Sequence, residues 1–465
     1  MIGVQSVLPV ALTAYFLAKG RRQRLFLLGI PFLLFMGSAL FFDRIKVPRL
    51  DNNQLILVCL VAVWIICTGS ILRNAVHPQG VGPFGPRRLL REEIPLIMLA
   101  GLVIFNTMLS IYRYGDSRLV LQEASSFGYL IAGYFLVRGI IAHFDRTSVS
   151  EFLGSLVGLN TIAAVLYILH QGLHVQIYEG GELMEISYFG QLITRTFWFM
   201  PPLLLFSLAY CLSKPRLNLH LLSTMLITLL AILISYTRFL AVTTATLIVL
   251  AVFLRVVKRQ KRTTAKWVIV LVIVGLVFTW GVKQFLPIQA QFMTERFNIL
   301  MRDPTSMDAN SWLGRRMLFL ATWEMIGQSN IVLGVGFPPT AQDSRVFLIT
   351  HWRADMLWIP IVFHLGLAGL VLIATLLFLH WIRALRLFLS ESGERAVLGL
   401  TFFLLLSSVA VEGLFSSSFM YWLRYPLGLW YLAFLAVGAA RGPGLEADVA
   451  TKSWFDAQPS LVQGS

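Results

Sequence analysis

Long apolar runs recur along almost the whole chain, and they constrain its fold more than any other feature. A helix needs about 20 apolar residues to cross the roughly 30 Å hydrocarbon core of a bilayer. Because hydrocarbon offers no hydrogen-bonding partner, a spanning segment must pair its own backbone groups, so these runs must be helices. We predict an all-α polytopic integral membrane protein with about 12–13 transmembrane helices, the first being short enough to be a re-entrant or interfacial piece instead. The candidate runs lie near 4–18, 24–42, 54–72, 94–112, 126–142, 152–171, 197–213, 218–235, 239–255, 266–285, 356–380, 396–415 and 419–439.

Composition and charge agree with that class and argue against nucleic-acid binding. Of the 465 residues, 57% are hydrophobic and 13% charged, and the formal net charge is +15. With the amino terminus outside, the short inner loops and the C-terminal tail together hold 23 Lys and Arg, and the short outer loops hold 8. Such an excess marks the cytoplasmic side, so the basic charge mainly reflects membrane orientation and contact with anionic lipid heads.

The runs and the loops between them divide the chain into five segments. The predicted segments are N-terminal transmembrane helices (1–196), central transmembrane helices (197–285), a long extracytoplasmic loop (286–355), C-terminal transmembrane helices (356–440) and a disordered cytoplasmic tail (441–465).

The long loop is predicted to be partly helical. Asn310 to Gln328 has helical spacing, and Ile331 to Phe337 follows as an apolar turn that contains Gly334 and Gly336. Its aliphatic residues and tryptophans are numerous enough for the loop to pack onto the membrane domain.

Arginines in the predicted outer regions could bind an anion. Arg238 lies between two runs with almost no loop, where a charge is costly unless it reaches water or an anion. It could snorkel to a lipid phosphate, or it could clamp the phosphate of a membrane-embedded substrate. Adjacent helical residues point about 100° apart, so only one of Arg315 and Arg316 can share a site with Arg238. Either could instead be an exposed charge or part of an ion pair within the loop.

The end of the long loop holds the candidate general base. His351 and Asp355 are four residues apart, so on a helix they would share a face and the carboxylate could orient the imidazole. The pair could equally be structural. Arg353, between them, is a further candidate for binding phosphate.

Common cofactor and catalytic signatures are absent from the sequence. It has no Walker loop, dinucleotide glycine pattern, H-E-x-x-H pair or lipase elbow. A clean acidic pair at the outer end of an early run, which could hold a metal, is also missing. We therefore predict a reaction that uses neither metal nor cofactor, while transport stays open on these grounds.

Six short elements follow one another over roughly residues 220–385, namely Ser235-x-x-Arg238, Gly314-Arg315-Arg316, Trp323-x-Met325-Ile326, Leu333-Gly334-Val335-Gly336-Phe337, His351 and Gly366-Leu-Ala-Gly369. Their order resembles that of the O-antigen ligase and Wzy-type polymerase superfamily. In that family a His-Asn pair stands shortly before the Gly-x-x-Gly element. Here Ala354 and Asp355 occupy that distance, and His351 lies about one helical turn earlier.

This resemblance implies a GT-C-like membrane glycosyltransferase at the outer face of the bacterial cytoplasmic (inner) membrane. It would polymerise repeat units carried on undecaprenyl pyrophosphate into a surface or exopolysaccharide. Arg238, with one of Arg315 and Arg316, would neutralise the leaving pyrophosphate, and His351 or Asp355 would deprotonate the acceptor hydroxyl. Its partners would be membrane lipids and polysaccharide export or chain-length machinery.

Two alternatives stay open. An O-antigen-type ligase, which transfers a finished glycan to lipid A-core or another outer acceptor, would carry the same motifs. A transporter or flippase of lipid-linked sugars belongs to a different class. That class predicts charges buried at the membrane midplane and needs no base at His351 or Asp355, whereas most charges here lie near the outer boundary.

Overall fold

The computed structural model describes the chain mainly between residues 93 and 415, and this part is largely helical. The predicted runs at 4–18, 24–42, 54–72 and 419–439, and the tail 441–465, lie outside the described residues. The described segments are 93–141, 200–215, 218–235, 238–258, 261–285, 310–339 and 358–415, with two short strands and isolated helical positions within 154–169 and 291–298.

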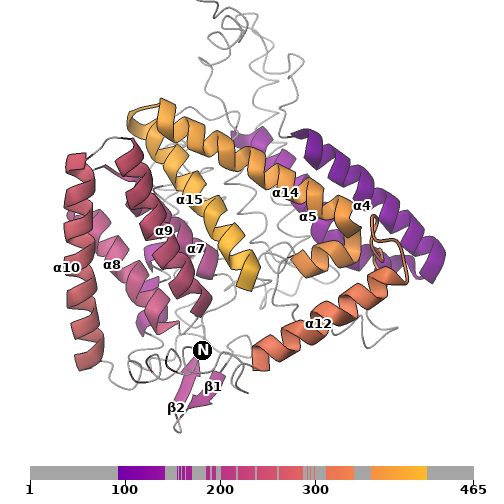
Figure 1. Ribbon diagram of the computed structural model, residues 1–465, viewed down its shortest axis with the longest axis horizontal. Coiled ribbons are helices and arrows are strands. Elements are labelled where there is room, and N and C mark those ends of the chain that lie inside the picture. Colours follow the sequence, from indigo (N-terminus) through magenta and orange to yellow (C-terminus); the bar gives the residue numbers. More distant parts are fainter. Residues whose placement is uncertain are drawn as a thin grey trace, which may run out of the picture.

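Helices cover the predicted runs throughout the continuously described segments (Figure 1). They are α4 (Glu93–Tyr114), α5 (Ser117–Ile141), α7 (Met200–Ser213), α8 (Leu219–Ile234), α9 (Arg238–Val257), α10 (Lys261–Phe285), α12 (Asn310–Gly327), α14 (Trp358–Ser390) and α15 (Gly393–Phe415). Among the described residues, four helices are long and apolar enough to cross a membrane, namely α4, α9, α14 and α15. The protein is thus a membrane protein of several helices, and the helix predicted inside the long loop is present as α12.

One short hairpin departs from the all-α prediction. Strands β1 (Glu185–Tyr188) and β2 (Gln191–Thr194) pair antiparallel, with Tyr188 opposite Gln191. The strands are rich in β-branched and aromatic residues, which favour extended backbone. The segment is too short to register as an apolar run.

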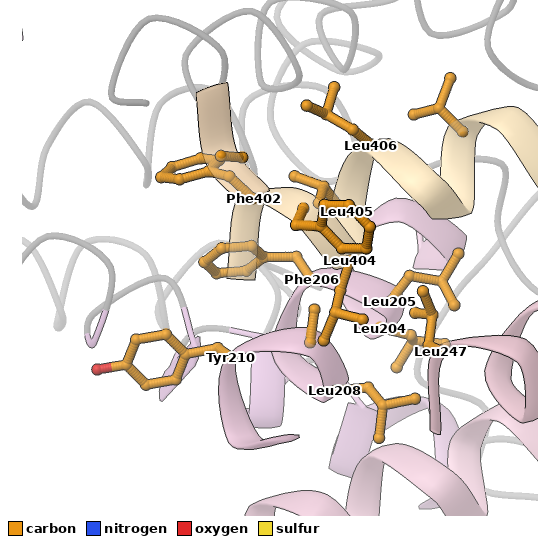
Figure 2. Close-up of a cluster of buried hydrophobic side chains, with 14 of the residues drawn as sticks. Leu204, Leu205, Phe206, Leu208, Tyr210, Leu247, Phe402, Leu404, Leu405 and Leu406 are labelled. Atoms are coloured by element: carbon orange, nitrogen blue, oxygen red, sulfur yellow. The ribbon is translucent and has the colours of Figure 1, made fainter. Parts of the chain in front are cut away.

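The pair of helices α14 and α15 forms the centre of the described bundle. Helix α15 packs against α7 and α9, and α14 packs against α4, which packs in turn against α5. Figure 2 shows buried side chains between α7 and α15, where Phe206 lies near Leu404 and Leu405, with Leu247 of α9 close by. In lipid, such interlocking side chains stabilise helix association mainly through van der Waals packing.

Basic side chains join several helix ends at one end of this bundle. Arg255 of α9 donates to the backbone carbonyl of Leu212 at the end of α7. Lys258, just after α9, donates to the carbonyls of Phe388 and Glu391 at the turn between α14 and α15. Such donors satisfy carbonyls that a helix leaves unpaired at its C-terminus. The charge pattern of the sequence predicts that the ends of α7, α9 and α14 joined here lie on the cytoplasmic side.

Candidate functional site

Helix α14 is interrupted near its start, at Gly366 (φ 63°, ψ −164°). In a continuous helix, each N–H donates to the carbonyl four residues earlier. The N–H of Leu367 would then bind the carbonyl of Phe363, and that of Ala368 would bind the carbonyl of His364. The interruption leaves both N–H groups and both carbonyls in need of other partners, which an apolar environment cannot supply.

A turn from the long loop supplies partners for the two N–H groups. Residues 330–337, called here the docked turn, lie against the interruption (Figure 1). Leu367 N–H donates to the carbonyl of Ile331 and Ala368 N–H donates to that of Val332, each over 3.0 Å. The N-terminal end of the second part of α14 is therefore occupied by protein carbonyls, so it is not an open anion site.

The two carbonyls of the interruption are satisfied as well. Phe363 O accepts a 2.7 Å bond from the backbone N–H of Val335 in the docked turn. His364 O accepts a 3.0 Å bond from the side-chain amide of Asn106, on α4. All four groups that the interruption exposes are thus paired, two by loop carbonyls, one by a loop N–H and one by an α4 side chain. The loop substitutes for one turn of the helix.

Two glycines make this close approach possible. Gly334 (φ 79°) in the docked turn and Gly366 (φ 63°) both have the left-handed conformation that favours glycine. A Cβ on Gly334 would lie 2.5 Å from Gly366 N and 2.7 Å from Phe363 O. A Cβ on Gly366 would collide with the carbonyl of Val332. The two glycine motifs of the sequence therefore meet each other in one contact.

Helix α4 binds the docked turn through two buried polar side chains that lie one helical turn apart. The amide of Asn106 also donates to the carbonyl of Leu333, over 2.7 Å. Ser110 Oγ accepts a 2.8 Å bond from the backbone N–H of Phe337. Together with His364 of α14, these residues form a polar cluster, so named below, that joins α4, α14 and the docked turn.

His364 faces the docked turn with its ring. Its side chain is 5% exposed, and Nδ1 lies 2.8 Å from the carbonyl oxygen of Gly336. Because a carbonyl can only accept, Nδ1 must carry the proton of this bond. The ring stacks on Phe337, with centroids 5.3 Å apart, and makes a T-shaped contact with the ring of Phe127 on α5.

The docked turn also anchors the end of α12. Ile326, near the end of that helix, is buried with Val335 of the docked turn and with Val362 and Phe363 of α14. Figure 1 shows α12 crossing the end of the bundle that lies opposite the α14–α15 turn. The helix is thus held at its C-terminal end against α14.

Helix register separates the two adjacent arginine positions of α12. Position 315 shares a face with Thr322 and Ile326, which follow it by about two and three turns and are both buried. Position 316 shares a face with Leu320, which is exposed. Of the two, position 315 therefore shares the face of α12 that is buried at Thr322 and Ile326.

The structure locates only some of the predicted site residues. Arg238 is the first residue of α9, and Arg315 and Arg316 lie within α12; their side chains lie outside the described part. His351, Arg353 and Asp355 lie outside the described residues altogether. Within the described residues, no three or more His, Cys, Asp and Glu side chains gather as metal ligands would.

Arg238 and α12 lie at the same end of the bundle. Helix α9 runs from Arg238 to the opposite end, where Arg255 and Lys258 bind the ends of α7 and α14. Helix α14 begins beside the docked turn and ends at that same opposite end. The start of α9, the docked turn and α12 are therefore all remote from the end that carries Lys258, as Figure 1 shows.

Sequence reasoning missed all three members of the polar cluster. Asn106 and Ser110 lie in the run 94–112 and His364 in the run 356–380, where only hydrophobicity was considered. Polar residues inside membrane segments are costly and usually have a specific partner. The spacing of Asn106 and Ser110, four residues apart on one helix face, was the signal that could have revealed them.

No protein-family model matches the chain, and no curated protein is significantly similar to it.

Proposed function

We propose that the protein is a membrane glycosyltransferase that polymerises undecaprenyl-pyrophosphate-linked oligosaccharide repeat units at the outer face of the bacterial cytoplasmic membrane. Its product would be a surface polysaccharide or an exopolysaccharide, passed on to export or chain-length machinery. The motif order of the sequence is the basis of this proposal, and one structural observation supports it.

That observation is the attachment of an arginine-bearing helix to the membrane domain. Helix α12, with Arg315 and Arg316, is fixed by the docked turn to α4 and α14. It lies at the end of the bundle where α9 begins with Arg238. A pyrophosphate whose polyprenyl chain lies in the bilayer would reach the membrane surface at the end of such a bundle. Arginine forks on two sides could bind it there without a metal.

The proposed reaction is one displacement at the anomeric carbon. The acceptor hydroxyl oxygen bonds to that carbon, and its proton passes to His351 or Asp355. The bond from the anomeric carbon to the pyrophosphate oxygen breaks, and undecaprenyl pyrophosphate leaves with the electron pair. Negative charge grows on the leaving group during this step, so Arg238 and an arginine of α12 would stabilise the transition state more than the ground state.

The test is complementation of a deletion strain with Arg238→Ala, Arg315→Ala, His351→Ala and Asp355→Ala. Extracted glycans would be resolved on a gel, with protein levels measured in parallel. The control is Arg395→Ala, at the opposite end of the bundle, because its half-exposed ion pair with Glu391 contributes little to stability. We expect the control to make normal chains. Long chains should be lost in Arg238→Ala, in Arg315→Ala and in either His351→Ala or Asp355→Ala.

The glycans that accumulate distinguish the alternatives. A polymerase defect leaves single repeat units on the carrier at the outer face. A ligase defect leaves full-length polymer on the carrier, and a transport defect leaves repeat units at the inner face. Normal chains from every well-expressed variant would contradict the catalytic role of this loop.

A further inference from the structure

We propose that His364 is a positioning residue, which holds the docked turn against α14 through its Nδ1–H and thereby sets the position of α12. The docking role stands on the geometry alone. Its effect on glycosyl transfer rests on the proposed function.

The first argument concerns the carbonyl of Gly336. Residues 334–339 are buried, and the ring of His364 provides a 2.8 Å donor to this carbonyl. A buried carbonyl that loses its partner destabilises the structure that buries it. A donor at the distance of Nδ1 from the backbone of position 364 therefore stabilises the docked state of the turn.

The second argument is that His364 contributes twice to the same junction. Its ring binds Gly336, while its backbone carbonyl accepts from Asn106. The same amide of Asn106 also binds Leu333, three residues before Gly336. The hydrogen bonds thus close a ring through α4, α14 and the docked turn, so loss of one member weakens the attachment of the other two.

The third argument links this junction to α12. Only Gln328 and Ser329 separate the end of α12 at Gly327 from the start of the docked turn. Asn330 shapes that start, because its Oδ1 accepts the backbone N–H of Val332 over 2.9 Å. With so short a connection, a shift of the docked turn would move the arginine-bearing helix with it.

Two substitutions, each of which keeps a nitrogen near the place of one ring nitrogen, separate this role from chemistry at Nε2. In His364→Asn, the side-chain amide nitrogen stands where Nδ1 stands, so the bond to Gly336 can form. In His364→Gln, the amide nitrogen stands near the place of Nε2 instead. His364→Ala leaves no nitrogen at either place. The matched control is His380→Gln, a change of another buried histidine on α14, whose ring makes a tilted contact with Tyr134 far from the docked turn.

Docking would be measured without reference to activity. Val335 is 7% exposed in the docked turn, so Val335→Cys, placed in a chain whose three native cysteines are replaced by alanine, reports undocking. In native membranes we expect a maleimide to label the Val335→Cys thiol about tenfold faster when His364→Gln or His364→Ala is added than when His364 is retained, because labelling requires local opening. His364→Asn and His380→Gln should label at the parental rate.

Polymer synthesis by the same His364 variants, with Val335 retained, completes the test. Loss of long chains in the Gln and Ala variants, with retention in the Asn variant, would support positioning through Nδ1. Loss of chains in the Asn variant with slow labelling would overturn it, since Nε2 would then be the essential atom. Slow labelling in every variant would overturn the docking role. Labelling as expected in a protein that makes no polysaccharide would refute the proposed function and leave the docking role intact.

Discussion

Asn106 satisfies two carbonyls with one amide, which makes it the most demanding residue of the polar cluster to replace. In Asn106→Leu, which roughly preserves the side-chain shape, the carbonyls of Leu333 and His364 both lose their donor. Each buried unsatisfied group costs about 1–3 kcal/mol, so we expect the free energy of unfolding to fall by about 2–6 kcal/mol. Denaturant unfolding in detergent micelles measures this.

The neighbouring residue gives the control for that measurement. Thr107 lies on the same helix, but its hydroxyl binds only the carbonyl of Val103 one turn earlier. Thr107→Val should therefore change the free energy of unfolding by no more than about 0.5 kcal/mol. Similar losses for Asn106→Leu and Thr107→Val would show that the contacts of Asn106 carry no special stability.

Gly334 and Gly366 are expected to tolerate no side chain. Alanine at either position would have an unfavourable positive φ and a Cβ in collision with backbone across the contact. The left-handed conformation alone costs about 1–2 kcal/mol, so each substitution should lower the free energy of unfolding by at least about 2 kcal/mol. Gly101→Ala, in α4 with open space around it, should be neutral or stabilising by up to about 1 kcal/mol. Melting temperatures that fall equally for the three variants would contradict this account.

At the scale of elements, hydrophobicity predicted where helices lie but not how α14 is built. The run 356–380 corresponds to the first part of α14, and the predicted helix Asn310–Gln328 corresponds to α12 almost to the residue. Hydropathy measures the preference of side chains for lipid, and the interrupted helix is as apolar as a continuous one. A glycine inside a helix costs only about 1 kcal/mol, so Gly366 alone did not reveal an interruption.

The face of α12 on which each arginine position lies gives a prediction that the sequence alone left open. Position 315 shares the buried face of Thr322 and Ile326, whereas position 316 shares the exposed face of Leu320. We expect Arg315→Ala to reduce polymer synthesis by about tenfold or more, as for loss of a charged transition-state contact, and Arg316→Ala to reduce it far less.

Lysine at position 315 completes the comparison. Because a guanidinium binds phosphate with two parallel bonds and an ammonium does not, Arg315→Lys should recover only part of the activity. The readout is the amount of long-chain glycan per amount of protein in membranes. A larger loss for Arg316→Ala than for Arg315→Ala would refute the assignment made from register.

At the scale of the whole molecule, the contacts that define the candidate site join residues far apart in the chain. Asn106 and Leu333 are separated by 227 residues, and Asn106 and His364 by 258. Local periodicity contains no information about such pairs, so the polar cluster could not be predicted from one sequence. By contrast, the sequence could predict which helix ends lie at the same end of the bundle. Each apolar run reverses the direction of the chain, and positive charge collects on one side of the membrane.

That alternation also predicts which side of the membrane carries the docked turn. Lys258 joins the helix ends assigned to the cytoplasm, and the docked turn lies at the other end of α14. In a chain without its three native cysteines, Gln328→Cys marks one end and Ser390→Cys the other, and both positions are exposed. A membrane-impermeant maleimide should label Gln328→Cys in intact cells and Ser390→Cys only after permeabilisation. The opposite pattern would place the arginines of α12 on the cytoplasmic side, where repeat units on the carrier have not yet been exported. It would therefore exclude polymerisation at the outer face.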